Sequence, residues 1–236
     1  MTEQPNTHAG EPTELGPTPG DRIFLCAILL VAGAGLGWLV DLLADWLVTL
    51  PWAPLQGPAK LITSVPQPGR TIGLIVLGGL IGVVGALLIQ HGELKVRLEG
   101  EMIELKRGDQ AQRVSRAQVA SAFLDEKHLV LLGHQGGELA REKCDLGAEK
   151  LAPAFTGHGY RWVDQDPHRT AFRPWVPETP DLPAGANALL KAREKAVKKS
   201  DTGEEQRELR AELARLGVVV RDSKGRQYWR PDNAAP

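Results

Sequence analysis

The 236-residue chain has only two cysteines, and this scarcity excludes a disulfide framework. Cys26 lies inside an apolar run, whereas Cys144 lies far from it in polar sequence. The six histidines show no metal-ligand spacing, and no cluster of cysteines or carboxylates completes a site, so we expect neither a metal nor a cofactor. No nucleophile, base and orienting group fall together, so we expect that the chain is not an enzyme.

A strong net charge is also lacking, because 28 lysines and arginines face 29 acidic residues. The balance is uneven along the chain, since residues 181–236 hold 12 basic residues against 9 acidic ones. The remainder is therefore mildly acidic. This small basic excess suits an anionic partner at the C-terminal end or an ordinary solvated surface.

Charge is absent from two long apolar runs, residues 23–40 and residues 71–90. A helix rises about 1.5 Å per residue, so about twenty residues cross the roughly 30 Å hydrocarbon layer of a bilayer. The proline-broken residues 51–70 between them are expected to be irregular. The sequence therefore predicts a two-span transmembrane hairpin over residues 23–90, with the lipid bilayer as its partner.

The basic residues that flank the two runs predict the orientation of the hairpin. The loop between the runs offers Lys60 and Arg70. The outer ends of the runs offer five basic residues: Arg22, Lys95, Arg97, Lys106 and Arg107. Because cytoplasmic flanks carry the excess of lysine and arginine, we expect a multi-pass protein of the cytoplasmic (inner) membrane with both termini in the cytoplasm.

Small residues at four-residue spacing make flat faces on both runs where helix backbones can approach. They are Gly33, Gly37, Gly78, Gly82 and Ala86. These faces support two hypotheses: the two helices of one hairpin pack on each other, or the second span forms a homodimer. Neither run has an ionisable residue in its middle, which disfavours a transporter or channel.

Three segments have the composition of tails or linkers. Residues 1–22 are rich in proline, threonine, glutamate and glycine, and they predict a disordered tail. Residues 164–180 are proline-rich and predict a linker that lets the C-terminal part reach outward, with Trp175 packed against a neighbouring module. Residues 232–236 predict a short terminal tail.

Residues 93–163 alternate between apolar and polar positions, which is typical of strands. The first two runs, over residues 94–98 and 103–106, are followed by strand candidates at 112–114, 119–124, 128–132 and 138–142 and by a helix at 147–155. This order of elements resembles a pleckstrin-homology-like (PH-like) domain. Its charged positions Lys95, Arg97, Lys106 and Arg107 suit either anionic lipid headgroups or a solvated face.

Residues 181–231 predict a small domain of two helices and a β-hairpin. The first helix covers residues 184–199, with apolar positions at Leu189, Leu190 and Val197. The second begins at a capping box formed by Thr202 and Glu205, with Leu209, Leu213 and Leu216 on one face. A strand from residue 218, a turn at 222–225 and a return strand at 226–230 follow.

This domain resembles the C-terminal anticodon-binding domain of bacterial cysteinyl-tRNA synthetases. The matching residues are Leu190, Arg193, Glu194, Ala196, Arg210, Glu212, Leu213, Leu216, Gly217, Val218, Asp222, Trp229 and Arg230. The catalytic domain of the synthetase has no counterpart in this chain, so we expect no aminoacylation. The whole arrangement is similar to the YqeB family of bacterial membrane proteins.

The resemblance implies contact with tRNA or another RNA. Cations suited to phosphates and rings suited to stacking on unpaired bases make nine candidate residues: Lys191, Arg193, Arg210, Arg221, Lys224, Arg226, Tyr228, Trp229 and Arg230. Glutamates interleave with them, as in any solvated helix pair, and Trp229 suits a small core equally well. The fold class is a membrane α-helical hairpin plus soluble α+β, and the function is RNA binding or, alternatively, protein contact by a structural adaptor.

Overall fold

The computed structural model describes residues 12–49, 57, 63–198, 203–223 and 225–232. The chain divides into two compact units. One contains residues 16–93 with 107–109, and the other contains residues 1–15, 94–106 and 110–236. We describe each unit by itself.

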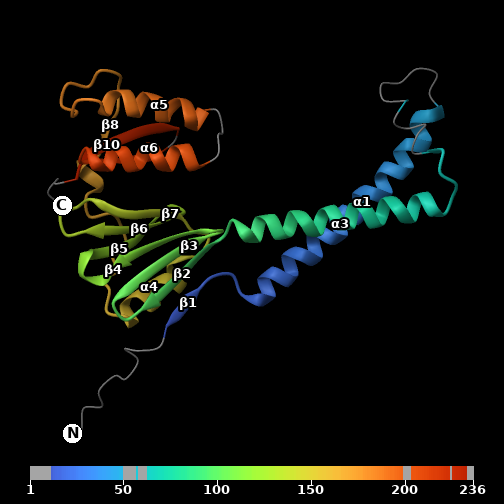
Figure 1. Cartoon of the computed structure of the whole chain (residues 1–236), viewed down its shortest axis with the longest axis horizontal. Coiled ribbons are helices and arrows are strands. Elements are labelled where there is room, and N and C mark those ends of the chain that lie inside the picture. Colours follow the sequence, from blue (N-terminus) through green and yellow to red (C-terminus); the bar gives the residue numbers. More distant parts are fainter. Residues whose placement is uncertain (1–11, 50–56, 58–62, 199–202, 224, 233–236) are drawn as a thin grey trace, which may run out of the picture. The chain divides into compact units, whose positions relative to one another are not determined.

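The first unit is a pair of helices, α1 (Pro19–Thr49) and α3 (Gly69–His91), which run side by side (Figure 1). Both are long and apolar enough to cross a membrane by length and composition. Thr18 begins α1, because Asp21 N donates to its hydroxyl at 3.2 Å and Thr18 N donates back to the Asp21 carboxylate at 3.1 Å. The predicted disorder of residues 1–22 is therefore wrong for this start of α1. Most of the predicted irregular connection lies outside the described residues.

The small residues predicted as packing faces lie where the two helices meet. A Cβ built on Gly33 would collide with the carbonyl oxygen of Gly78, and one on Gly82 would collide with that of Leu29. Gly37 approaches the backbone of α3 as closely, and Ala86 is fully buried. This face is used inside one hairpin, so a homodimer through the second span would have to use another face.

A polar cluster joins the two helices at one end of the hairpin. Arg70 lies between Asp41, whose Oδ1 is 2.5 Å from its Nε, and Asp45, whose Oδ2 is 2.6 Å from its Nη2. Thr71 donates a further hydrogen bond to Asp41 at 2.5 Å. Arg70, one of the two basic residues of the loop, is thus ion-paired within the hairpin.

The second unit begins with a strand that the sequence analysis missed, β1 (Thr13–Leu15). It pairs antiparallel with β2 (Leu94–Glu99), with Leu15 opposite Val96, and Leu15 packs on the core. The predicted disorder is wrong here as well, because an edge of the sheet supplies the hydrogen-bond partners that the local sequence lacks. In chain order β1 precedes α1 and β2 follows α3, so the helix pair is inserted between two paired strands.

Two antiparallel sheets and one helix form the PH-like module. β1 and β2 continue into β3 (Met102–Arg107) and β4 (Gln110–Ser115), and the 3₁₀ turn Arg116–Gln118 leads to the second sheet. That sheet contains β5 (Val119–Asp125), β6 (His128–Gly133) and β7 (Glu138–Lys143). The predicted alternation is confirmed, since Leu94, Val96 and Leu98 are buried while Lys95 is exposed.

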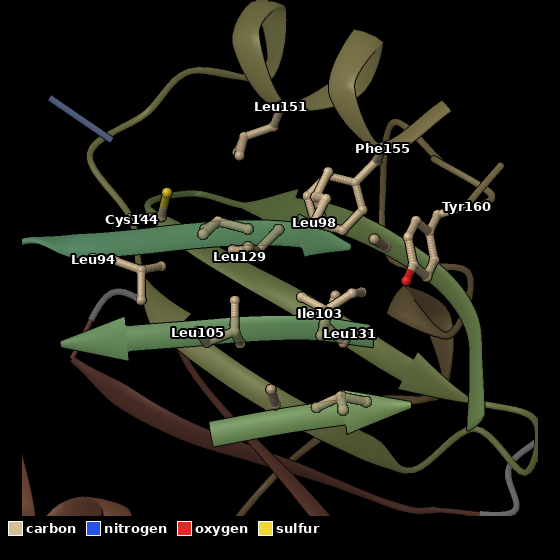
Figure 2. Close-up of a cluster of buried hydrophobic side chains, with 14 residues drawn as sticks. Leu94, Leu98, Ile103, Leu105, Leu129, Leu131, Cys144, Leu151, Phe155 and Tyr160 are labelled. Atoms are coloured by element: carbon tan, nitrogen blue, oxygen red, sulfur yellow. The ribbon is translucent and has the colours of Figure 1, made fainter. Parts of the chain in front are cut away.

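The helix α4 (Ala148–Gly157) closes the core of this module. Leu151 and Phe155 point from α4 onto apolar side chains of the strands, as Figure 2 shows. The Phe155 ring meets the Tyr160 ring edge-on, with 5.8 Å between the ring centroids. The predicted α+β module is thus confirmed.

The proline-rich segment after this module is more ordered than a linker. It contains a 3₁₀ turn, Arg169–Ala171, and a strand, β8 (Arg173–Pro174), which pairs with β10 (Arg226–Pro231). Trp175 packs against the core of the C-terminal domain, as predicted, and its Nε1 donates to Asn187 Oδ1 at 3.1 Å. The expected outward reach is wrong because this segment adds a strand to the domain that follows.

The C-terminal domain contains α5 (Ala186–Lys198), α6 (Gly203–Arg215) and a sheet of order β8-β10-β9, where β9 covers Val218–Ser223. The predicted two helices and β-hairpin are confirmed. The apolar faces differ in detail, because Ala186, Leu190, Arg193 and Ala196 are the buried positions of α5 and Val197 is exposed. Leu213 is the buried residue of α6, whereas Leu216 is exposed. The capping residue Thr202 lies outside the described residues.

Candidate functional site: a charged contact between the PH-like module and the C-terminal domain

The β5-β6-β7 sheet is buried on both faces. Leu129 and Leu131 of β6 enter the core beneath α4, whereas Val130 and Leu132 point to the opposite face and cluster with Phe123. The strand register and the alternation of side chains place Asp125 and Arg141 on this opposite face as well. This face therefore has an apolar centre with charged groups beside it.

The sheet of the C-terminal domain presents two different faces in the same way. Val218, Val220 and Trp229 enter the core of the domain. Val219 and Arg230, which lie opposite each other in the register, point to the other face and are also buried. Something other than the core of the domain must cover that face.

Four ion pairs meet at two carboxylates of the PH-like module. Arg141 bonds to both of them, to Asp125 and, at 3.0 Å, to Glu138. From the C-terminal domain, Arg221 Nη2 lies 2.7 Å from Asp125 Oδ1 and Arg210 Nη1 lies 3.1 Å from Glu138 Oε2. The side chains of the two acids and Arg141 are each less than one-tenth exposed, so these pairs are shielded from solvent.

A second set of bonds lies within the C-terminal domain. Arg193 donates to both carboxylate oxygens of Asp222, at 2.7 and 2.5 Å, and to Gln227 Oε1 at 2.9 Å. Arg210 extends toward the same carboxylate at 3.9 Å and donates to the carbonyl of Val220. We call the seven residues of both sets the charged contact: Asp125, Glu138, Arg141, Arg193, Arg210, Arg221 and Asp222.

Arg230 makes a separate contact with the PH-like module. Its guanidinium is fully buried and donates to the carbonyl oxygen of Gly136, in the β6–β7 turn, at 2.7 Å. It also stacks over the Phe172 ring, 5.3 Å from the ring centroid. Gly136 has φ +81°, and a Cβ there would meet the Asp232 carbonyl oxygen at 2.5 Å. A glycine is therefore required where the two modules approach.

Burial and neighbouring charges shift the pKa values of Arg210 and Asp222 in the charged contact and of His128 beside it. Burial lowers the pKa of Arg210 to about 10, although Glu138 opposes the shift. Burial would raise the pKa of Asp222, but Arg193 outweighs it and the pKa is lowered. Burial lowers the pKa of His128, and the cations Arg141 and Arg210 lower it further.

The structure separates the nine predicted RNA-binding residues. Arg193, Trp229 and Arg230 are buried, and Arg210 and Arg221 are engaged in the charged contact. The prediction that these five contact RNA directly does not fit this arrangement, because their polar or aromatic groups already have partners within the chain. Lys191 and Arg226 are exposed, Tyr228 is half-buried, and Lys224 lies outside the described residues.

Asp125, Glu138 and Arg141 were not among the predicted site residues, because their alternation along the strands is typical of an ordinary solvated face. One signal was available for Arg193, which falls three residues after Leu190 on the buried side of α5. A cation on an apolar stripe indicates a buried acidic partner.

A pocket of about 240 Å³ lies beside the charged contact. Its lining is mostly charged: Leu124, Asp125, Asp164, Gln165, Asp166, Arg169 and Arg221. Over the part of the chain that the structure describes, no group of three His, Cys, Asp or Glu side chains is placed to hold a metal ion.

Comparison with known proteins gives two family matches. Residues 13–163 match the family described as the YqeB-like bacterial PH domain, and residues 179–230 match the cysteinyl-tRNA ligase anticodon binding domain. The chain is 39% identical over 225 residues to a Bacillus subtilis (strain 168) protein described as "Uncharacterized protein YqeB". That alignment covers 95% of this chain and 93% of the relative. No solved structure gave a significant match. On these matches the chain belongs to the YqeB family.

Proposed function

We propose that this protein is a membrane-anchored, non-enzymatic adaptor. Its PH-like module and C-terminal domain form one platform for contacts with other proteins. The observation that carries this proposal is the charged contact, in which Arg210 and Arg221 pair with acids of the PH-like module. The C-terminal domain thus already uses its cations for contact with protein.

The charges of the two partners are complementary. Asp125, Glu138 and Arg141 give the module's side a formal charge of −1, and Arg193, Arg210, Arg221 and Asp222 give the other side +2. Complementary charge favours one docking geometry and disfavours others. This supports a platform of fixed shape.

We place the platform in the cytoplasm, at the inner membrane. The five basic residues that flank the outer ends of the helices, against Lys60 and Arg70 in the loop, support this orientation. An alkaline phosphatase fused after Pro236 should be inactive and a green fluorescent protein at the same place should fluoresce. The reverse result would contradict the orientation.

The adaptor function is tested by crosslinking in living cells. The tagged full chain should recover the same set of proteins with and without ribonuclease, and a variant ending at residue 93 should lose them. A set of partners that disappears after ribonuclease treatment would contradict the proposal.

RNA binding is a second candidate, favoured by the match of residues 179–230 to an anticodon binding domain. With the two modules in contact, RNA would bind through the exposed Lys191, Lys195 and Arg226 and the half-buried Tyr228. Ultraviolet crosslinking followed by RNA sequencing tests it. Replacement of Lys191 and Arg226 by alanine should reduce the crosslinked RNA, and an unchanged yield would count against it.

A further inference from the structure

The pocket beside the charged contact contains a buried carboxylate that is only half satisfied. Asp166 is 6% exposed, and its Oδ1 accepts a hydrogen bond from the backbone N–H of His168 at 2.8 Å. Its Oδ2 is buried and has no hydrogen-bond donor among the described residues. The charge of Asp166 interacts with that of Arg230, but this does not supply the missing donor. A buried carboxylate oxygen without a donor is costly, so a ligand that donates a hydrogen bond to Asp166 would be favoured.

The lining of the same pocket also contains a buried donor without an acceptor. Arg221 pairs with Asp125 through its Nη2, at 2.7 Å. The Nε of Arg221 is buried and has no acceptor within the described part of the chain. The pocket therefore combines one unmet acceptor with one unmet donor. A ligand that satisfies both must carry a donor at one end and an acceptor at the other.

The charges that remain in the lining are balanced. Asp125 is already paired with Arg141 inside the PH-like module. Two acids of the lining, Asp164 and Asp166, are then matched by two cations, Arg169 and Arg221. Asp164 and Arg169 are exposed, so they stand on the solvent side of the pocket. Equal and opposite charges of this kind suit a ligand with one ammonium group and one oxyanion.

The pocket is small, and backbone hydrogen bonds fix one of its walls. Its volume of about 240 Å³ lies below the roughly 300–1,000 Å³ of pockets for drug-sized ligands. Val163 N donates to the carbonyl of Ala122 in β5 at 3.0 Å, and Arg169 N donates to the carbonyl of Asp166 at 3.2 Å. The segment that carries Asp164 and Asp166 is thus held against β5 and closed into a turn. The pocket suits a ligand the size of an amino acid.

We propose that this pocket binds a small zwitterion. Asp164 and Asp166 hold its ammonium group. Arg169 and Arg221 hold its oxyanion. A free α-amino acid and glycerophosphoethanolamine, the headgroup portion of a lipid, share this chemistry. The inference goes beyond the adaptor function, which needs no ligand. Because the PH-like module, the segment after it and the C-terminal domain all line the pocket, the ligand would act on the platform as a whole.

Isothermal titration calorimetry on the full chain, in the uncharged detergent dodecyl maltoside, tests the proposal. The probes are the twenty amino acids and glycerophosphoethanolamine, each at millimolar concentration. At least one probe should bind, and the class that binds more tightly identifies the source of the ligand. If no probe binds, the proposal is overturned.

Derivatives of the tightest probe test each of its charges. Its N-acetyl derivative lacks the ammonium group and should bind about tenfold more weakly, the loss expected for one charge-assisted hydrogen bond. The carboxamide of an amino acid, or ethanolamine in place of the headgroup, lacks the oxyanion and should be weakened to a similar extent. A derivative that binds as tightly as its parent contradicts recognition of a zwitterion.

Substitutions locate the bound probe. Asp166→Asn and Arg169→Gln should each weaken binding about tenfold. The matched controls Asp109→Asn and Arg113→Gln remove the same charges from exposed positions outside the pocket and should bind like the wild type. Asp164→Asn, at an exposed position, gives a second test of the acidic side if Asp166→Asn does not fold. If the pocket variants bind like their controls, the probe binds elsewhere and the proposal fails.

Hydrogen exchange with the tightest probe separates binding from general stabilisation by a solute. Amides of residues 163–169 should exchange more slowly in its presence, whereas those of β2 and β3 should be unchanged. Equal slowing across all of these segments would show a solute effect without a site, and would overturn the proposal.

Discussion

Replacing Arg193 with methionine should loosen the C-terminal domain from within. The side chain of Arg193 is 2% exposed, and its guanidinium makes three hydrogen bonds, two to the Asp222 carboxylate and one to Gln227. Methionine keeps the length and the apolar stem but removes every donor. Asp222 then loses its bidentate partner, and Gln227, which is 7% exposed, keeps a carbonyl oxygen without a donor.

The magnitude follows from how far the abandoned groups can regain water. Breaking a fully buried ion pair by removing one partner costs about 3–5 kcal/mol. The side chain of Asp222 is 39% exposed and can rehydrate in part, so we expect a loss of about 2–3 kcal/mol. At about 1.4 kcal/mol for each factor of ten, amides of β9 and β10 should exchange roughly 30 to 150 times faster.

Hydrogen exchange of the full chain measures this loss where it occurs. The matched control is Lys198→Met, on the same helix, because the pair of Lys198 with Glu194 is exposed and should contribute about 0.5 kcal/mol or less. If the two substitutions accelerate exchange equally, Arg193 is not a structural cation and the assignment of its role is refuted.

Three further predictions concern other parts of the chain. Gly33→Val should destabilise the helix pair by about 1–3 kcal/mol through overpacking, measured as a lower midpoint of detergent-induced unfolding. Gly35→Val should leave this midpoint unchanged, because nothing lies within 4 Å of a Cβ at residue 35. The pKa of His128 is lowered from its ordinary value of 6.5, so below about pH 6.5 the unfolded chain binds a proton that the folded chain does not bind. Protonation therefore favours the unfolded chain, and the melting temperature should fall as the pH drops. The fall should be smaller in His128→Gln. Trp175→Ala should cost about 2–3 kcal/mol and speed proteolysis of the C-terminal domain. Trp175→Phe should cost only about 1 kcal/mol, for the lost bond to Asn187; equal losses would contradict the packing role.

The elements with strong periodic patterns could be predicted from the sequence. Leu94, Val96 and Leu98 are buried as their alternation requires, and the small residues Gly33 and Gly82 meet the opposite helix. In these segments the local pattern and the tertiary environment agree, because the pattern itself records which side is buried.

The elements that depend on a distant partner could not be predicted. β1 and β8 are two short strands in proline-rich or polar sequence, and each exists because an edge far along the chain offers hydrogen bonds. The site was missed for a related reason. A lysine or arginine in sequence looks the same whether it faces water or a carboxylate on another module, so Arg210 and Arg221 were assigned to RNA.

The pairing of β1 with β2 makes the helical hairpin an insertion between two neighbouring strands of one sheet. Leu15 already faces Val96 across that pair, so the ends of the insertion are held together by the sheet itself. Replacing residues 17–93 with a short glycine-rich turn should therefore yield a water-soluble protein that retains both soluble modules. Residence in the membrane and folding of the sheet are then separable properties of the chain.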